Sequence, residues 1–98
     1  MPRIRTRPGE ILAEEFLKPH GITAHGLALA LRVPPSRIAG ILNEKNPRAV
    51  TADTALRLSR FFGTSAQFWL NLQSSYDLSV AEAQLRKQIE QDVRPYAA

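Results

Sequence analysis

Residues 23–43, TAHGLALALRVPPSRIAGILN, contain two short segments with apolar residues at helical spacing, separated by a break. Thr23 is a good N-cap for the first segment. The apolar stripe of that segment repeats at spacings of three and four: Ala24, Leu27, Ala28 and Leu31. Val33 and Pro34 interrupt the pattern, and Pro35 can open a second helix where its missing N–H costs nothing. The buried side of the second helix would be formed by Ile38, Ile41 and Leu42. This layout predicts a helix-turn-helix.

The second of these helices carries side chains suited to reading DNA. In a helix-turn-helix, the N-terminal part of the second helix contacts base edges in the major groove. Burial of its apolar side leaves Ser36, Arg37 and Gly40 on the outer face. Arg37 can pair with guanine O6 and N7, Ser36 can bond to a base or phosphate, and Gly40 keeps the surface low. An αα-hairpin with Arg37 as a solvated surface residue fits the same periodicity.

Polar residues at the ends of the two helices are suited to the DNA backbone. Thr23 and His25 lie at the start of the first helix, where free N–H groups favour phosphate. Lys45 and Arg48 follow the second helix and can contact flanking phosphates. Thirteen Lys and Arg against nine Asp and Glu give a net charge of +4, all of it in the first half of the chain. A nucleic acid partner for that half is one interpretation of this mild positive excess.

The rest of the chain predicts further helices and no sheet, because no comparable segment alternates at period two. Pro8 can open the first helix, and Pro19 followed by Gly21 ends it. Three more helices are expected after good N-cap residues: Thr51, Ser65 and Ser79. In the helix after Thr51, the expected buried face is Ala52, Ala55, Leu56, Ser59 and Phe62.

We divide the chain into a basic arm (residues 1–7), a DNA-binding domain (residues 8–76) and a C-terminal helix with tail (residues 77–98). The arm carries Arg3, Arg5 and Arg7, and it either enters a minor groove or stays solvated. Four residues near the end of the domain either fill the core or form a dimer interface: Phe68, Trp69, Leu72 and Tyr76. A polar segment beyond them carries an apolar stripe that must dock on its own domain, a twin or another protein: Leu85, Ile89 and Val93.

Composition argues against several other classes of protein. The 98 residues leave no room for a separate ligand-sensing domain, so we expect no small-molecule ligand and no cofactor. Cysteine is absent, and His20 and His25 alone do not make a convincing metal site. No phosphate loop or nucleophile elbow is present, so we expect no enzyme activity and no catalytic residue. Apolar runs are too short for a membrane span and no signal peptide is seen, so we expect a cytoplasmic protein.

Three segments together resemble HigA-type antitoxins of the XRE (Cro/C1-type) helix-turn-helix family. They are PGEIL at residues 8–12, TADTALRL at residues 51–58 and FWLNLQ at residues 68–73. The resemblance covers roughly residues 7–83. It implies a Cro/C1 (lambda-repressor-like) all-α domain of five to six helices with a C-terminal helical extension. It also implies a dimer that represses its own promoter and silences a RelE/HigB-like mRNA-endonuclease toxin, as the antitoxin of a type II module.

The resemblance also assigns individual positions and shows two departures. Ser36, Arg37 and Gly40 match groove-facing positions, and four residues match phosphate-facing positions: Thr23, Ala24, Asn43 and Lys45. Arg32 stands where the turn usually has Gly, so we expect a distorted turn if this residue is left-handed. Ala24 replaces a frequent Gln and lacks its phosphate contact. Two alternatives remain, a stand-alone repressor without a toxin partner and an interaction module that has lost DNA binding.

Overall fold

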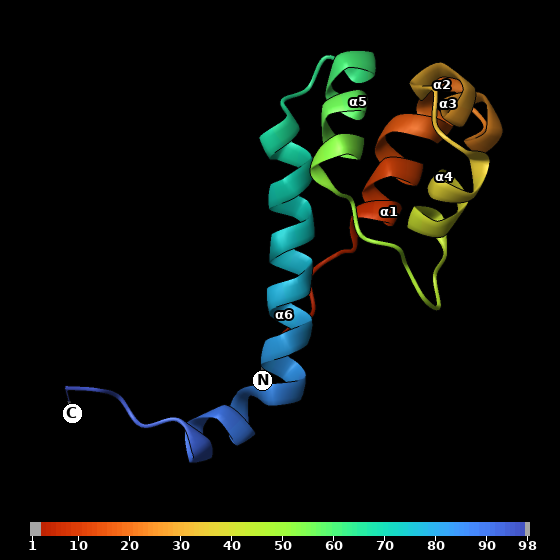
Figure 1. Ribbon diagram of the computed structural model, residues 1–98. Helices are drawn as coiled ribbons and strands as arrows, with labels where there is room; N and C mark the ends of the chain where they lie inside the picture. The colour runs from red at the N-terminus through yellow and green to blue at the C-terminus, as the bar shows by residue number, and fades with distance from the viewer. Residues whose placement is uncertain (1–2, 98) are drawn as a thin grey trace.

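The computed structural model describes residues 3–97 as a bundle of five helices with no strand in that range, which confirms the all-α prediction (Figure 1). The first helix is continuous over three elements, and four more helices follow it. Their bounds are α1 (Pro8–Ile11), η1 (Leu12–Leu17), α2 (Lys18–His20), α3 (Ala24–Leu31), α4 (Pro35–Leu42), α5 (Ala52–Phe62) and α6 (Ala66–Asp92).

The first helix contains a π-helical segment, η1, that accommodates Pro19. The Lys18 N–H donates to the carbonyl of Ala13, five residues earlier rather than four. A proline has no N–H, and its ring collides with the carbonyl four residues before it in a regular α-helix. The wider turn of a π-helix relieves this conflict, so the helix runs past the proline. It ends before Gly21, whose φ of 63° is left-handed, as the sequence predicts.

Side-chain caps begin three of the helices at the predicted residues. The Thr23 hydroxyl accepts from the Gly26 N–H at 2.9 Å, and the Ser65 hydroxyl accepts from the Phe68 N–H at 3.0 Å. Thr51 accepts from the N–H three residues after it at the start of α5. Each cap satisfies one N–H that the helix leaves unpaired, so the helices start where the polar residues stand.

The predicted cap at Ser79 is wrong, because residues 66–92 form one helix. Ser79 is buried inside α6, where its hydroxyl donates to the carbonyl of Tyr76 at 2.8 Å. Its oxygen also accepts from the backbone N–H of Arg5 at 2.9 Å, and the arm runs along α6 there (Figure 1). Residues 1–2 of the predicted arm lie outside the described residues. The boundary we placed between residues 76 and 77 falls within this helix.

One apolar core joins all the helices, and Trp69 is at its centre with 0% of its surface exposed. Its Nε1 donates to the Thr64 hydroxyl at 2.7 Å, and its ring centroid lies 4.9 Å from that of Phe16. Trp69 is therefore excluded from the predicted dimer interface, because its side chain is enclosed by its own domain. The predicted buried face of α5 is also partly wrong, since Leu58 is buried whereas Leu56 is 62% exposed.

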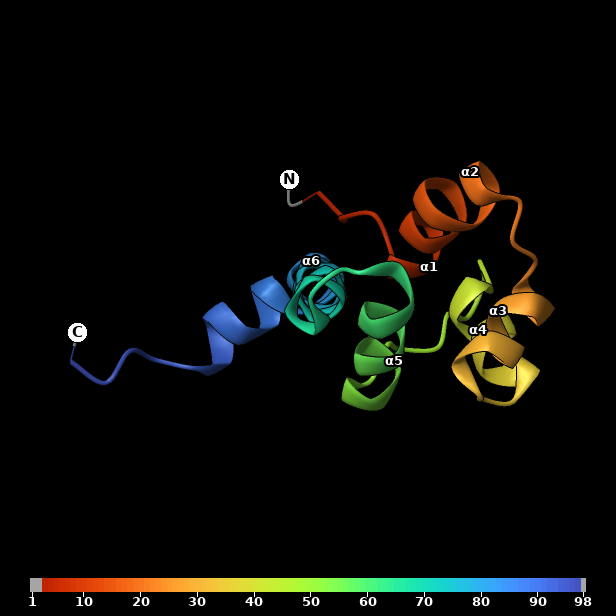
Figure 2. The same ribbon diagram turned by 90° about the horizontal axis from the view of Figure 1, so that it is seen from above.

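The second half of α6 projects away from the bundle. Its first half packs against α5, and its last turns bend away in both views (Figures 1 and 2). The radius of gyration is 16.2 Å, compared with about 13 Å for a compact chain of this length. A further hydrogen bond connects the loop before α5 to α6: the Val50 N–H donates to the Gln73 side chain at 2.7 Å.

Candidate nucleic-acid interface

The turn between α3 and α4 is regular. Arg32 is left-handed, with φ 61° and ψ 43°, which confirms the conformation expected of a residue that replaces glycine. Its N–H donates to the carbonyl of Leu29 at 3.2 Å, and the Val33 N–H donates to that of Ala28 at 3.1 Å. These bonds form a Schellman-type end to α3. The distorted turn that we expected is therefore not seen, and the left-handed arginine is held at a cost of about 1 kcal/mol.

Glycine at position 9 lets the first helix support α4 from behind. A Cβ built on Gly9 would lie only 2.1 Å from the carbonyl oxygen of Ile41. Such proximity requires a residue without a side chain, because carbon and oxygen repel at that distance. The glycine of the PGEIL segment therefore fixes how closely α1 approaches the second helix of the helix-turn-helix.

The three predicted base-reading residues lie at the N-terminal end and middle of α4. Ser36 is exposed, and the Arg37 side chain is 29% exposed. Gly40 has a role that the sequence did not indicate. A Cβ at this position would lie 3.2 Å from the side chain of Arg48, whose N–H also donates to the Gly40 carbonyl at 2.8 Å. Glycine here makes room for the arginine, so the structure brings a predicted base reader and a predicted phosphate contact together.

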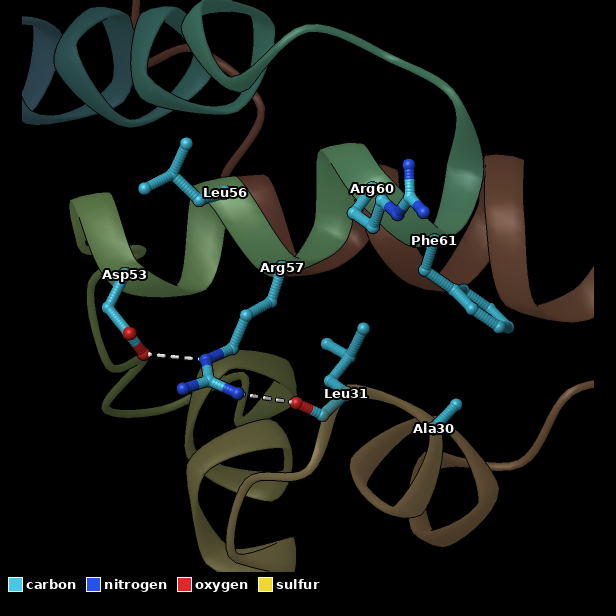
Figure 3. Close-up of a pocket in the computed structure, with 7 residues that line it drawn as sticks. All are labelled: Ala30, Leu31, Asp53, Leu56, Arg57, Arg60 and Phe61. Carbon is cyan, nitrogen blue, oxygen red and sulfur yellow. Dashed lines mark hydrogen bonds and ion pairs between the residues drawn. The ribbon is translucent and has the colours of Figure 1, made fainter.

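Asp53 connects α4 with α5 through two arginines. Its Oδ2 accepts from Arg37 Nη1 at 2.5 Å and from Arg57 Nε at 3.1 Å. Arg57 Nη1 also donates to the carbonyl of Leu31 at 2.8 Å, at the end of α3 (Figure 3). Hydrogen bonds from Arg57 and then Arg37 hold the pKa of the Asp53 carboxyl below its ordinary value. The carboxylate is thus ionised at neutral pH and joins three helices.

Sequence reasoning did not find this network. Asp53 was visible only as an acid in the first turn of a helix, where it suits the helix dipole. Its partner Arg57 stands four residues later, a spacing that brings side chains together on a helix and was the one available signal. The bond to Arg37 spans 16 positions in the sequence, and no local pattern indicates it.

The predicted phosphate-facing residues fall into two groups. Thr23, Ala24 and His25 lie at the N-terminus of α3, with His25 exposed and Ala24 half-buried. The second group follows α4 and consists of Asn43, Lys45 and Arg48, all exposed. Asn43 has a structural role as well, because its Oδ1 accepts from the N–H groups of Lys45 at 2.9 Å and Asn46 at 3.0 Å. This Asx-type turn directs the chain away from α4 and leaves the amide N–H₂ of Asn43 available.

A hollow of about 600 Å³ lies between α3 and α5, beside the Asp53 network (Figure 3). It is lined by Ala30, Leu31, Asp53, Leu56, Arg57, Arg60 and Phe61. Leu56, which we predicted to be buried in the core, lines this hollow instead. In the part of the chain that the structure describes, no group of three or more potential ligands is placed to hold a metal ion. Over the same residues, no helix has the length and apolar character required to cross a membrane.

These features define a helix-turn-helix domain with Lys45 and Arg48 in the loop after α4. Comparisons with known proteins give the same class of domain. A helix-turn-helix family model matches residues 14–69. Virulence-associated protein I of Dichelobacter nodosus is 61% identical over 82 residues, which cover 84% of this chain and 72% of that protein. Several solved structures match nearly the whole chain, among them the following two. An addiction module antidote protein of the HigA family from Coxiella burnetii has 48% identity, a TM-score of 0.87 and coverage of 96% and 100% of the two chains.

The second structure is the Pseudomonas aeruginosa antitoxin HigA with the higBA promoter. It has 46% identity and a TM-score of 0.85, and the match covers 98% of this chain and 99% of that one. The chain therefore belongs to the XRE-type helix-turn-helix family, and its structural neighbours are HigA antitoxins. This confirms the resemblance noted in the sequence. The family has the fold of a DNA-binding regulator and not that of an enzyme.

Proposed function

We propose that this protein is the cytoplasmic antitoxin of a type II toxin–antitoxin module. It binds the operator of its own promoter as a dimer and neutralises a RelE/HigB-like mRNA-endonuclease toxin. The observation that carries the proposal is the placement of Ser36 and Arg37 at the N-terminus of α4. They occupy this place in a chain that matches, over 98% of its length, an antitoxin solved with its promoter.

In this proposal α4 lies in the major groove and Arg37 reads a guanine through O6 and N7, with Ser36 and Gly40 beside it. A bidentate contact of this kind discriminates against the wrong base by about 1–3 kcal/mol. The two groups of phosphate-facing residues contact the backbone on either side of the groove: Thr23, Ala24 and His25 before it, and Asn43, Lys45 and Arg48 after it. If a dimer contacts about eight phosphates, log K falls with log salt at a slope near −7.

The dimer is formed by α6. Phe68, Leu72 and Tyr76 remain candidates, since Phe68 is 37% exposed and the other two are half-buried. Beyond them Leu85 and Ile89 are exposed on the part of α6 that leaves the bundle. An exposed apolar stripe on a projecting helix is stabilised when a second copy covers it. A two-fold dimer places two α4 helices about 34 Å apart, one turn of DNA, and repression is occlusion of the promoter.

The toxin binds a second surface. Two candidates remain, the arm with the first helix and the face of the C-terminal part of α6 that the second copy does not cover. The two candidate surfaces are adjacent where the backbone N–H of Arg5 donates to the Ser79 hydroxyl of α6, so a toxin could contact both there.

Two experiments test the proposal. In the first, the tagged protein is co-expressed with the product of the neighbouring reading frame, and the purified material is weighed by light scattering. A stable hetero-complex that also relieves growth arrest by the neighbour supports the antitoxin. A homodimer without a partner, together with operator binding, supports the stand-alone repressor instead.

The second experiment measures binding to a fluorescent duplex of the promoter. We expect Arg37→Ala to weaken specific binding by roughly 5- to 150-fold, the range that a bidentate base contact gives. Arg94→Ala is the matched control, because Arg94 is an exposed arginine in the tail after α6. Absence of specific binding by both wild type and Arg37→Ala would favour the interaction module that has lost DNA binding.

A further inference from the structure

We propose that Asp53 is a specificity-determining residue that positions Arg37 for base reading, an inference that rests on the proposed DNA binding. Arg37 lies on α4 and Asp53 in the first turn of α5, so the contact fixes a side chain of the reading helix from a second helix. The positioned group is the Arg37 guanidinium, which in the proposed complex donates to O6 and N7 of a guanine.

The bond uses only part of the guanidinium. Arg37 Nη1 donates to Asp53 Oδ2, and among the described residues the guanidinium has no other hydrogen-bond partner. An arginine presents five N–H donors in a planar fork. The donors that do not face Asp53 therefore remain available for a base, and a carboxylate on one edge of the fork fixes the direction in which the other edge points.

The position of Asp53 is itself well defined. Its Oδ2 also accepts from Arg57 Nε, and Arg57 Nη1 donates to the Leu31 carbonyl just before the turn (Figure 3). The carboxylate is thus held in place relative to both helices of the helix-turn-helix. Arg57 connects it to the end of α3, and Arg37 connects it to α4. A rearrangement of either helix would move the group that holds Arg37.

The negative charge of Asp53 distinguishes a positioning role from an electrostatic contribution to DNA affinity, because the charge itself opposes binding to DNA. A carboxylate beside a DNA-facing arginine lowers the general attraction to phosphate, since it cancels part of the positive charge. Without Asp53 the arginine would be free to move among phosphates, a contact that carries no sequence information. Removal of the carboxylate should therefore reduce base discrimination while it leaves non-specific affinity unchanged or higher.

The test uses the full-length protein and a library of duplexes with 20 randomised base pairs. Selection with wild type, Arg37→Ala and Asp53→Asn identifies the guanine that depends on Arg37. Anisotropy titrations then give the ratio of affinities for the selected duplex and for one with that guanine replaced. We expect Asp53→Asn to lower this ratio by about fivefold or more, toward the Arg37→Ala value and not beyond it. Asp92→Asn, the same change at the far end of α6, should leave the ratio unchanged.

Two further measurements keep the result interpretable. Circular dichroism melting establishes that Asp53→Asn is folded at the titration temperature. The ¹⁵Nε relaxation of Arg37 in the free protein reports its order directly, and we expect a more mobile guanidinium in the variant. An Asp53→Asn variant with wild-type discrimination would overturn this inference and leave the proposed function standing. The same holds for a variant that binds more tightly with undiminished discrimination, because Asp53 would then only compete with DNA for Arg37. Wild-type protein without any sequence preference would overturn the proposed function and this inference with it.

Discussion

The close approach of α1 to α4 makes Gly9→Ala a destabilising substitution. The added Cβ would lie 2.1 Å from the Ile41 carbonyl oxygen, and ordinary contact begins at 3.4 Å. The two helices must therefore separate by 3.4 − 2.1 = 1.3 Å, and the obstacle is backbone, which cannot rotate away. Overpacking of this kind costs about 3 kcal/mol, from which roughly 1 kcal/mol of improved helix propensity is subtracted.

The expected net loss of about 2 kcal/mol lowers the melting temperature by roughly 8–16 °C for a domain of this size. Thermal unfolding followed by far-ultraviolet circular dichroism measures it, and urea unfolding gives the free energy independently. Gly26→Ala is the matched control, because its Cβ would meet only the Thr23 hydroxyl, at 3.1 Å. A Gly9→Ala protein that melts at or above the wild-type temperature would refute the packing argument.

Three other substitutions have definite expected outcomes. Arg32→Gly should raise the unfolding free energy by about 1 kcal/mol, since it relieves a left-handed arginine with φ 61°; a lower melting temperature would contradict this. Trp69→Ala should cost about 3–5 kcal/mol, whereas Phe68→Ala, at a partly exposed site, should cost clearly less in the same urea titration. Ile89→Glu should shift the proposed dimer toward monomer in sedimentation velocity, and Gln88→Glu should not; equal masses would place the dimer interface elsewhere.

The helix starts could be predicted from the sequence because their signals are local. A threonine or serine three residues before the N–H that it caps identifies the beginnings of α3, α5 and α6. The helix-turn-helix was predictable for the same reason, since its apolar stripes and proline break lie within residues 23–43. Ser79 misled the prediction because serine also bonds to a carbonyl three residues back inside a helix.

Other features depend on contacts between distant residues, which a single sequence does not contain. Leu56 and Leu58 are both apolar, and only the packing of α5 into the common core buries Leu58 and leaves Leu56 exposed. Trp69 could be assigned to a core or an interface by its size alone. The contact between Arg37 and Asp53, which organises the candidate interface, lies across a loop whose path the sequence does not define.

The bond between Val50 and Gln73 has a mechanical consequence for a two-fold assembly. The loop that leaves the reading helix has no regular structure of its own, yet its backbone is anchored to the helix that is proposed to join the two copies. In a dimer joined through α6, this hydrogen bond and the packing of α5 on α6 would both limit how far each reading helix can move relative to the other. If the proposed dimer forms, we expect an operator with one base pair inserted between its half-sites to bind more weakly than the natural spacing.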